Sequence, residues 1–265
     1  MKLSIITVNL NNKDGLQKTI DSVITQTYKD FEWIVIDGGS TDGSKELIEK
    51  YSDHISYWVS EPDKGIYNAM NKGIRVAKGD YLHFLNSSDI YIDNNTLKKF
   101  FSTSNQSDIL FGNTLKPKDG KYVRINCRND FITCYSLVKD TINHQCAFIK
   151  RKLFEDFGLY DESLKIVSDW KFFFEAIVIR KCSAHHIDQD IVMYDTNGIS
   201  SLYPNKLKKE KLTILKQYLP EYVIDDYLYR VEKNELMNHR FSRIIIAILY
   251  RFVVRMEKMG LICKS

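Results

Sequence analysis

Residues 3–85 alternate short apolar segments with segments of helical periodicity, and this alternation strongly limits the folds the chain can adopt. Strands are predicted at residues 3–8, 31–36, 55–59 and 81–85, and helices at residues 14–26, 44–51 and from about Ile66 to Ala77. Strand–helix repeats with short connections build parallel sheets that are covered by helices. The sequence therefore predicts an α/β fold with a doubly wound, mostly parallel sheet.

The second half of the chain is less regular. Further strands are predicted at residues 108–111 and 122–125, a helix at residues 150–157, and another helix with Ser168 as its N-cap. A boundary is predicted near Tyr203-Pro204, after which the chain becomes basic and helical. The predicted organisation is thus one domain over residues 1–203 and a basic helical C-terminal extension over residues 204–265.

Composition excludes several classes of protein. The chain has 265 residues, enough for one large domain with an appendage, and its net charge of +4 does not indicate a nucleic-acid partner. Its five cysteines are odd in number and form no CxxC pair, which favours a reducing cytosol. No signal peptide is expected, and no apolar run reaches the roughly 20 residues that span a bilayer.

Polar side chains follow each of the first four predicted strands. They are Thr7 and Asn9, Asp37, Asp63, and the segment Asn86-Ser87-Ser88-Asp89. Because the carboxyl ends of parallel strands share one edge, these loops are expected to converge there, where ligands of open α/β sheets bind. Three carboxylates on one edge repel each other unless they face a cation or hydrogen-bond donors. A nucleotide with Mg²⁺ or Mn²⁺ supplies both.

Each of these acids also has a simpler interpretation. Asp37 and Asp42 can serve as turn and helix-capping residues, Asp63 can belong to an ordinary turn, and Asp89 can be a cap. The glycines of residues 38–43 have Walker A spacing, but Ser44-Lys45 follows where Lys-Ser/Thr is required, so this is not a P-loop. The prediction of a site rests on the four loops meeting, and on no single residue.

Four segments together resemble the family 2 inverting glycosyltransferases, most closely those that build bacterial O-antigen, capsule and colanic-acid-type polysaccharides. They are Ser-Ile-Ile-Thr-Val-Asn (4–9), Ile-Val-Ile-Asp-Gly-Gly-Ser-Thr-Asp-Gly (34–43), Glu-Pro-Asp-Lys-Gly-Ile-Tyr-Asn-Ala-Met-Asn-Lys-Gly (61–73) and Phe-Leu-Asn-Ser-Ser-Asp (84–89). The resemblance covers roughly residues 2–201. It implies a GT-A, Rossmann-like fold, a nucleotide-sugar donor (usually a UDP-sugar) and a divalent metal, Mn²⁺ or Mg²⁺.

The resemblance also implies roles for single residues. Thr7, Asn9, Asp37 and Asp63 would line the uridine pocket. The family's metal motif is commonly Asp-x-Asp-Asp, whereas residues 86–89 keep only its last acid. Asp89 would therefore hold the metal, with Asn86 and Ser88 as weaker supporters of donor binding. One acid can suffice, because Mg²⁺ often binds through one or two carboxylates together with phosphate oxygens.

The catalytic base is expected in the second half, because inversion requires a group that deprotonates the incoming hydroxyl on the acceptor side. The family's acidic pair at a helix start matches Ser168-Asp169-Trp170, so Asp169 is the predicted base. The alternative is that Asp169 only occupies a helix's first turn, where negative charge is favoured. His144 is interpreted as a structural residue or as a contact to donor phosphate or acceptor, and residues 194–201 resemble a late loop that closes over the donor.

The basic tail has two interpretations. Residues 206–216 are cationic, and residues 241–256 form an apolar run interrupted by arginines. This run can anchor the protein peripherally on an anionic membrane, near a lipid-linked acceptor, or pack on protein. The predicted function is transfer of a sugar from a UDP-sugar to a lipid-linked or growing saccharide acceptor, at the cytoplasmic face of the cell membrane. The alternatives are a sugar-nucleotide pyrophosphorylase and a non-catalytic nucleotide- or sugar-binding module.

Overall fold

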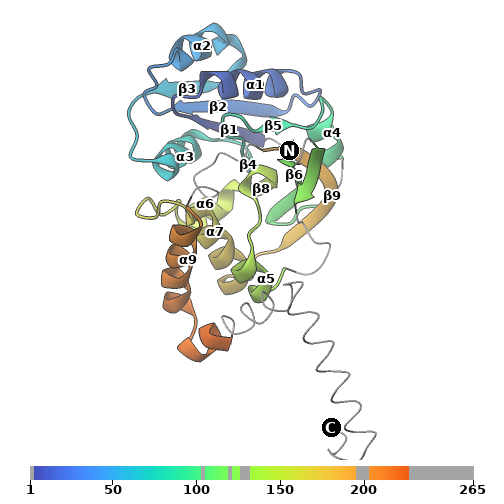
Figure 1. Cartoon of the computed structure of the whole chain (residues 1–265). Coiled ribbons are helices and arrows are strands. Elements are labelled where there is room, and N and C mark those ends of the chain that lie inside the picture. The colour runs from blue at the N-terminus through green and yellow to red at the C-terminus, as the bar shows by residue number, and fades with distance from the viewer. Residues whose placement is uncertain (1–2, 103–104, 119–120, 126–131, 195–202, 227–265) are drawn as a thin grey trace, which may run out of the picture. The chain divides into compact units, whose positions relative to one another are not determined.

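A computed structural model describes residues 3–102, 105–118, 121–125, 132–194 and 203–226 (Figure 1). The chain divides into two compact units, Met1–Lys211 and Leu212–Ser265, and helix α9 (Pro204–Tyr218) crosses the division. The predicted domain boundary near Tyr203-Pro204 stays a prediction. Most of the predicted late loop and the whole apolar run of residues 241–256 lie outside the described residues.

The first unit contains a mixed sheet that, in the described residues, has nine strands. They are β1 (Leu3–Asn9), β2 (Phe31–Asp37), β3 (Tyr57–Ser60), β4 (Tyr81–Phe84), β5 (Ile90–Tyr91), β6 (Ile109–Lys118), β7 (Lys121–Ile125), β8 (Ala147–Lys150) and β9 (Ala184–Met193). Their order is β3-β2-β1-β4-β8-β6-β9-β5, and β7 pairs with β6. Strands β3, β2, β1 and β4 are parallel to one another, whereas β8 is antiparallel to both β4 and β6.

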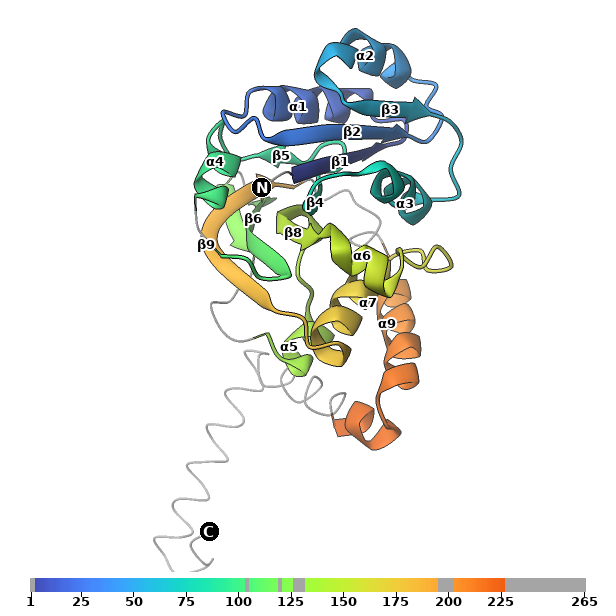
Figure 2. The same ribbon diagram turned by 180° about the vertical axis from the view of Figure 1, so that it is seen from behind.

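Helices cover both faces of the parallel half. Those that precede α9 are α1 (Lys13–Ile24), α2 (Ser44–Lys50), α3 (Ile66–Val76), α4 (Thr96–Phe101), α5 (Cys134–Lys139), α6 (Arg151–Phe157) and α7 (Ser168–Phe174). Single turns of other helix types lie at η1 (Ser52–His54), η2 (His144–Cys146) and η3 (Glu175–Ile179). Figures 1 and 2 show α1 and α2 on one face of the sheet, and α3 and α6 on the other.

Strands β1, β2 and β4 are buried on both faces, and most of their residues are apolar at odd and even positions alike. Every residue of β1 is buried. Leu3 and Ile5 belong to a core cluster with Leu16 and Ile20 of α1. Ile6 points the opposite way, toward α3, where a Cβ added to Gly73 would lie 2.5 Å from Ile6 Cγ2. Glycine at this position therefore lets α3 approach the sheet closely.

The predicted mostly parallel, helix-covered sheet is confirmed, with differences at particular elements. The third strand is shifted to Tyr57–Ser60 at the sheet edge, where its residues are only partly buried and give a weaker apolar signal. The prediction that Ser168 is an N-cap is wrong. Helix α7 begins at Ser168 itself, and Val167 is its N-cap without a side-chain hydrogen bond. Within the described residues, no helix is both long and apolar enough to cross a membrane.

His83 of β4 is a buried ionisable group in the middle of the sheet. Its ring stacks on Phe148 at 4.3 Å and on Tyr91 at 5.6 Å between centroids. Its Nδ1 lies 3.1 Å from the carbonyl oxygen of Ala147, while Nε2 has no hydrogen-bond partner in the described structure. Burial lowers the pKa of His83 to about 3. The folded protein therefore holds this imidazole neutral.

Exchange of His83 for phenylalanine is expected to make stability less dependent on pH below neutrality. Between the unfolded-state pKa near 6.5 and the folded value of about 3, only the unfolded chain binds this proton. The free energy of unfolding should therefore fall by about 1.4 kcal/mol per pH unit on acidification through this group. The free energy of unfolding, measured with urea at pH values from 7 to 5, should fall less steeply with decreasing pH for His83→Phe than for the wild type. This holds whatever the difference in stability between the two proteins at pH 7. The control His54→Phe, at an exposed position, should keep the wild-type slope, and an unchanged slope for His83→Phe would contradict the prediction.

Candidate active site

The register of the first three strands aligns three polar residues at the carboxyl edge of the sheet. Asn9 of β1 pairs with Asp37 of β2, and Asp37 pairs with Ser60 of β3. The fourth loop continues this edge, because Leu85 N donates to the carbonyl oxygen of Ile6 and Ser87 N to that of Val8. The four predicted loops therefore do converge on one edge.

Asp37 is fully buried and is the centre of a dense set of hydrogen bonds. Its Oδ1 accepts from Asn9 Nδ2 at 2.8 Å and from Ser40 Oγ at 2.5 Å, and its Oδ2 accepts from Ser60 Oγ at 2.6 Å. The backbone amides of Gly39 and Ser40 also donate to Oδ2, at 3.2 and 2.9 Å. Burial raises the pKa of Asp37, but bonds from Ser40, Ser60 and Asn9 outweigh it and lower this pKa. Asp37 is therefore an ionised group that fixes three loops.

Two other acids of these loops are placed by their own turns. Asp42 accepts from Ser44 N and from Lys13 N, the first backbone amides of α2 and α1, although Gly43 and Asn12 are the N-cap residues of these helices. Asp63 accepts from Gly65 N at 2.8 Å, and its Oδ2 would lie 2.4 Å from a Cβ added to Gly38. Asp63 is therefore both a turn residue and a neighbour of the loop that follows Asp37.

Thr7 is placed differently from the other predicted residues of the edge. It is fully buried, and its Oγ1 accepts a hydrogen bond from Trp33 Nε1 at 3.0 Å. This hydroxyl holds the indole of Trp33 in the core. The predicted nucleotide contact of Thr7 stays a prediction.

The segment Asn86–Asp89 is packed against the start of α1. Ser88 has a positive φ of 80°, and its Oγ accepts from Asn12 Nδ2 at 3.0 Å. A Cβ on Gly15 would lie 2.1 Å from Ser88 Oγ, so glycine is required for this contact. Thr19 Oγ1 donates to the carbonyl oxygen of Asp89 at 2.9 Å. These contacts fix the backbone on both sides of the Asp89 side chain, which is nearly buried.

The oxygen atoms near Asp89 can coordinate a divalent cation whose remaining ligands come from another molecule. Among the described residues, no three His, Cys, Asp or Glu side chains form a cluster that could hold a metal alone. Asn86 Oδ1 is buried and has no hydrogen-bond partner in the described structure. One carboxylate and one free amide oxygen are hard ligands of the type that Mg²⁺ and Mn²⁺ prefer. The residues thus fit such a cation only in part.

Asp169 and His144 form a partly buried pair close to this loop. Asp169 Oδ2 lies 3.0 Å from His144 Nδ1, and His144 Nε2 lies 3.2 Å from Asn86 Nδ2. On the other side, Asp169 Oδ1 lies 2.9 Å from the hydroxyl of Tyr67, which also lies 2.6 Å from the carbonyl oxygen of Ile166. Asn86, His144, Asp169 and Tyr67 thus form one hydrogen-bonded series, called the Asp169 series below.

The electrostatics of the pair favour an ionised carboxylate. Burial raises the pKa of Asp169, but the hydrogen bond and charge of His144 and the Tyr67 hydroxyl outweigh it and hold this pKa below its usual value. Burial lowers the pKa of His144, and Asp169 more than reverses this, so the His144 pKa is raised. Both side chains keep some exposure, 14% for Asp169 and 16% for His144. Asp169 is therefore an ionised carboxylate that is held in a fixed position and stays partly exposed.

Tyr67 was not singled out by the sequence analysis. It lies within a segment that carries the family resemblance, but its partner Asp169 is 102 residues away. Glu162 likewise accepts from Asn68 Nδ2 at 2.8 Å and from Asn71 Nδ2 at 2.9 Å, which ties the segment before α7 to α3. A pattern along one sequence carries no signal for such pairs.

Comparison with known proteins identifies relatives of this arrangement. The family model for glycosyl transferase family 2 matches residues 4–158. An uncharacterized glycosyltransferase of Mycobacterium tuberculosis is 33% identical over 204 residues, which cover 75% of this chain and 77% of that protein. A PGL/p-HBAD biosynthesis glycosyltransferase of the same species is 30% identical over 175 residues, which cover 64% of this chain and 67% of that protein.

Solved structures with the same fold agree with these relatives. The chain is similar to S. aureus TarS, with a TM-score of 0.67 and 20% identity over 91% of this chain and 45% of TarS. It is also similar to the mannosyltransferase PcManGT of Pyrobaculum calidifontis, solved with GDP-Man and Mn²⁺, with a TM-score of 0.58 and 13% identity over 95% of this chain and 80% of that one. The expected GT-A fold is confirmed.

Exchange of Asp37 for asparagine is expected to destabilise the protein although the two side chains have nearly the same shape. The change removes a charge that accepts five hydrogen bonds, and donors buried around it lose their charged partner. A loss of about 2–4 kcal/mol in the free energy of unfolding is expected, measured by urea denaturation. Asp21→Asn, at an exposed site on α1, is the matched control and should change stability by less than about 0.5 kcal/mol. Equal urea midpoints for Asp37→Asn and the wild type would contradict this account.

Proposed function

Because the chain belongs to the family 2 glycosyltransferases, we propose that it transfers a sugar, with inversion, from a nucleotide-sugar to a lipid-linked or growing saccharide acceptor. UDP-sugars are the first donors to test. The observation that carries the proposal is the Asp169 series, which joins an ionised carboxylate to the loop edge through His144 and Asn86. The relative named as a PGL/p-HBAD biosynthesis glycosyltransferase supports a role in glycosyl transfer.

The loop edge is the proposed donor site. Asp63 and Asn9 would contact the nucleoside, and Asp37 would hold Asn9 and the Ser40 amide in place for it. Asp89 and the free Oδ1 of Asn86 would hold a divalent cation together with the diphosphate. Such a cation, when bound, neutralises negative charge on the leaving nucleoside diphosphate.

Asp169 is the proposed general base. It accepts the proton of the acceptor hydroxyl while that oxygen bonds to the anomeric carbon and the bond from this carbon to the diphosphate breaks. A carboxylate with a low pKa is a weak base, so proton transfer fits a late stage, when the attacking oxygen has become acidic through its new bond. His144 and Tyr67 hold the two carboxylate oxygens in fixed positions. They are positioning residues in this proposal.

The basic residues at the start of α9 support the proposal that the protein acts near a membrane surface. The exposed lysines in its first two turns are Lys206, Lys208 and Lys209. Clustered lysines are attracted to anionic lipid headgroups by about 1 kcal/mol each. Peripheral association with the inner face of the cell membrane, in the synthesis of a surface polysaccharide or glycolipid, is part of the proposal.

The donor class can be tested by thermal shift with UDP, GDP, CDP and dTDP, each with and without Mn²⁺. A ligand that binds only the folded state raises the melting temperature. UDP with Mn²⁺ is expected to give the largest increase, and Asp89→Ala should remove the Mn²⁺-dependent part. GDP is a necessary comparison, because PcManGT was solved with GDP-Man. A larger shift with GDP would change the donor, and no shift with any of the four would overturn the proposed donor site.

The catalytic roles can be tested by release of nucleoside diphosphate from the best-binding nucleotide-sugar, with water as acceptor. Asp169→Asn is expected to lower this rate by about 10²–10⁴-fold, since it removes a general base. The melting-temperature shift by the nucleotide should persist. Loss of nucleotide binding in this variant, or an unchanged rate, would contradict the role of Asp169 as base.

Variants of His144 test whether this side chain positions Asp169 by its hydrogen bond or only fills space beside it. His144→Asn keeps an N–H donor near the place of Nδ1 and should retain more activity than His144→Leu, with the difference in kcat and little change in KM. His185→Leu is the control, because His185 is an exposed imidazole on β9. Equal rates for His144→Asn and His144→Leu would show that the hydrogen bond to Asp169 has no role in turnover.

A further inference from the structure

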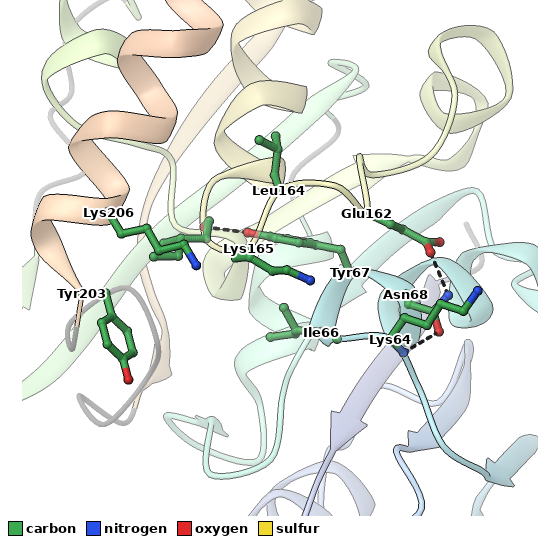
Figure 3. A pocket seen from close by; sticks show the side chains of 11 residues that line it. Lys64, Ile66, Tyr67, Asn68, Glu162, Leu164, Lys165, Tyr203 and Lys206 are labelled. Carbon is green, nitrogen blue, oxygen red and sulfur yellow. Dashed lines mark hydrogen bonds between the residues drawn. The ribbon is translucent and has the colours of Figure 1, made fainter.

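A cavity of about 630 Å³ lies next to the Asp169 series, on the side of Tyr67 (Figure 3). Its walls come from the loop before α3 and the start of that helix, the segment before α7, and the start of α9. The lining side chains that matter for its chemistry are Lys64, Tyr67, Glu162, Lys165, Tyr203 and Lys206. Tyr67 belongs both to this cavity and to the Asp169 series.

Three lysines from three different elements line this cavity. Among the described residues, no carboxylate forms an ion pair with Lys64, Lys165 or Lys206. The acid that lines the cavity, Glu162, accepts hydrogen bonds from Asn71 and Asn68 of α3, and the charges of Arg75 and Lys64 lower its pKa further. The three ammonium groups therefore leave the cavity with excess positive charge and with N–H donors that a ligand can use.

The walls of the cavity are held together by specific contacts. The carboxylate of Glu210 on α9 accepts from Lys165 N at 3.3 Å and from Ile166 N at 3.0 Å. Lys211 Nζ donates to the carbonyl oxygen of Asp140 at 3.0 Å and lies 4.8 Å from the centroid of the Trp170 ring. The segment with Lys165 and the helix with Lys206 are thus fixed to each other and to the body of the domain.

Most of the cavity lies away from the proposed donor edge, and only Lys64, which directly follows Asp63, adjoins that edge. Asn86, at one end of the Asp169 series, belongs to the proposed donor loop, and Tyr67, at the other end, lines the cavity. Asp169 lies between these two ends. An inverting transfer needs the acceptor to approach opposite the leaving diphosphate, with the base beside it. The cavity is where such an acceptor can be held.

We propose that this cavity binds a phosphate or diphosphate group of the acceptor, through Lys64, Lys165 and Lys206. The inference rests on the proposed function and specifies its acceptor as an anionic one. Three ammonium groups suit a phosphate better than a neutral saccharide, because hydrogen bonds between charged partners are about twice as strong as neutral ones. Ile66, Leu164 and Tyr203 line the same cavity and can contact the apolar part of a sugar or a hydrocarbon chain.

Inorganic pyrophosphate and farnesyl diphosphate are suitable probes, measured by calorimetry with the full chain in the presence of EDTA. EDTA removes the divalent cation on which diphosphate binding at the donor edge would depend. The double variant Lys165→Gln/Lys206→Gln is expected to bind both probes more weakly, by about tenfold or more for each lysine. The matched control Lys98→Gln changes an exposed lysine of α4 that does not line the cavity and should bind as the wild type does.

The two probes separate the two sources of the anion. Farnesyl diphosphate binding more tightly than pyrophosphate would identify a lipid diphosphate, and equal binding would identify a phosphate without lipid. In both cases the double variant must weaken binding. Unchanged binding by the double variant, or displacement of pyrophosphate by UDP in the wild type, would overturn the proposal, because the anion would then occupy another site.

The thermal shift by UDP and Mn²⁺ is measured on the same preparations. A normal shift in the double variant, together with weaker diphosphate binding, is the expected result. A normal shift with unchanged diphosphate binding overturns the anionic acceptor alone. No shift in the wild type would instead overturn the proposed donor site, so the two failures are distinguishable.

Discussion

The contact between His144 and Asp169 joins the two halves of the first unit, and the geometry of the candidate site depends on it. His144 begins a short turn before β8, and Asp169 lies in the first turn of α7. Through Asn86 the pair is tied to the loop after β4, and through Tyr67 to α3. Each side chain offsets the free-energy cost of removing the other from water. Removal of either residue would therefore leave its partner in the protein interior without this compensation. The segments of the first unit that carry His144 and Asp169 are thereby fixed against the parallel strands.

Asp37 is the second constraint, and its bonding limits how it can take part in ligand binding. A carboxylate offers about four lone-pair sites, and Asp37 already accepts from Asn9, Ser40, Ser60 and two backbone amides. A direct bond to a nucleoside would require one serine hydroxyl to turn away. The alternative is that Asp37 orients Asn9 and the 39–40 loop, which then contact the ligand. In either case the hydrogen bonds of Asp37 hold the three loops of this edge together.

The sequence predicted the parallel half well because its signals are local. Apolar runs and helical spacing mark β1, α1, β2 and α3, and the polar residues that follow each strand indicate the shared edge. What it could not predict depends on distant pairs. Tyr67 meets Asp169, and the segment with Lys165 meets Glu210, only because β8 and α7 return to the sheet. Ser168 was wrongly expected to cap a helix, because residue preference identifies a helix start only to within a residue or so.

The loss of acids from the metal motif has a structural consequence. Where the resembling family commonly has Asp-x-Asp-Asp, residues 86–89 carry one charge, and Ser87 and Ser88 accept from Asn12 Nδ2 at 3.3 and 3.0 Å. Acids at these positions would repel Asp89 and would need a cation for the loop to hold its shape. With amide and hydroxyl groups, the loop is stabilised by α1 instead. A cation then meets one carboxylate and must take its other ligands from the diphosphate. On the proposed function, the metal and the nucleotide-sugar therefore bind together, each completing the site of the other.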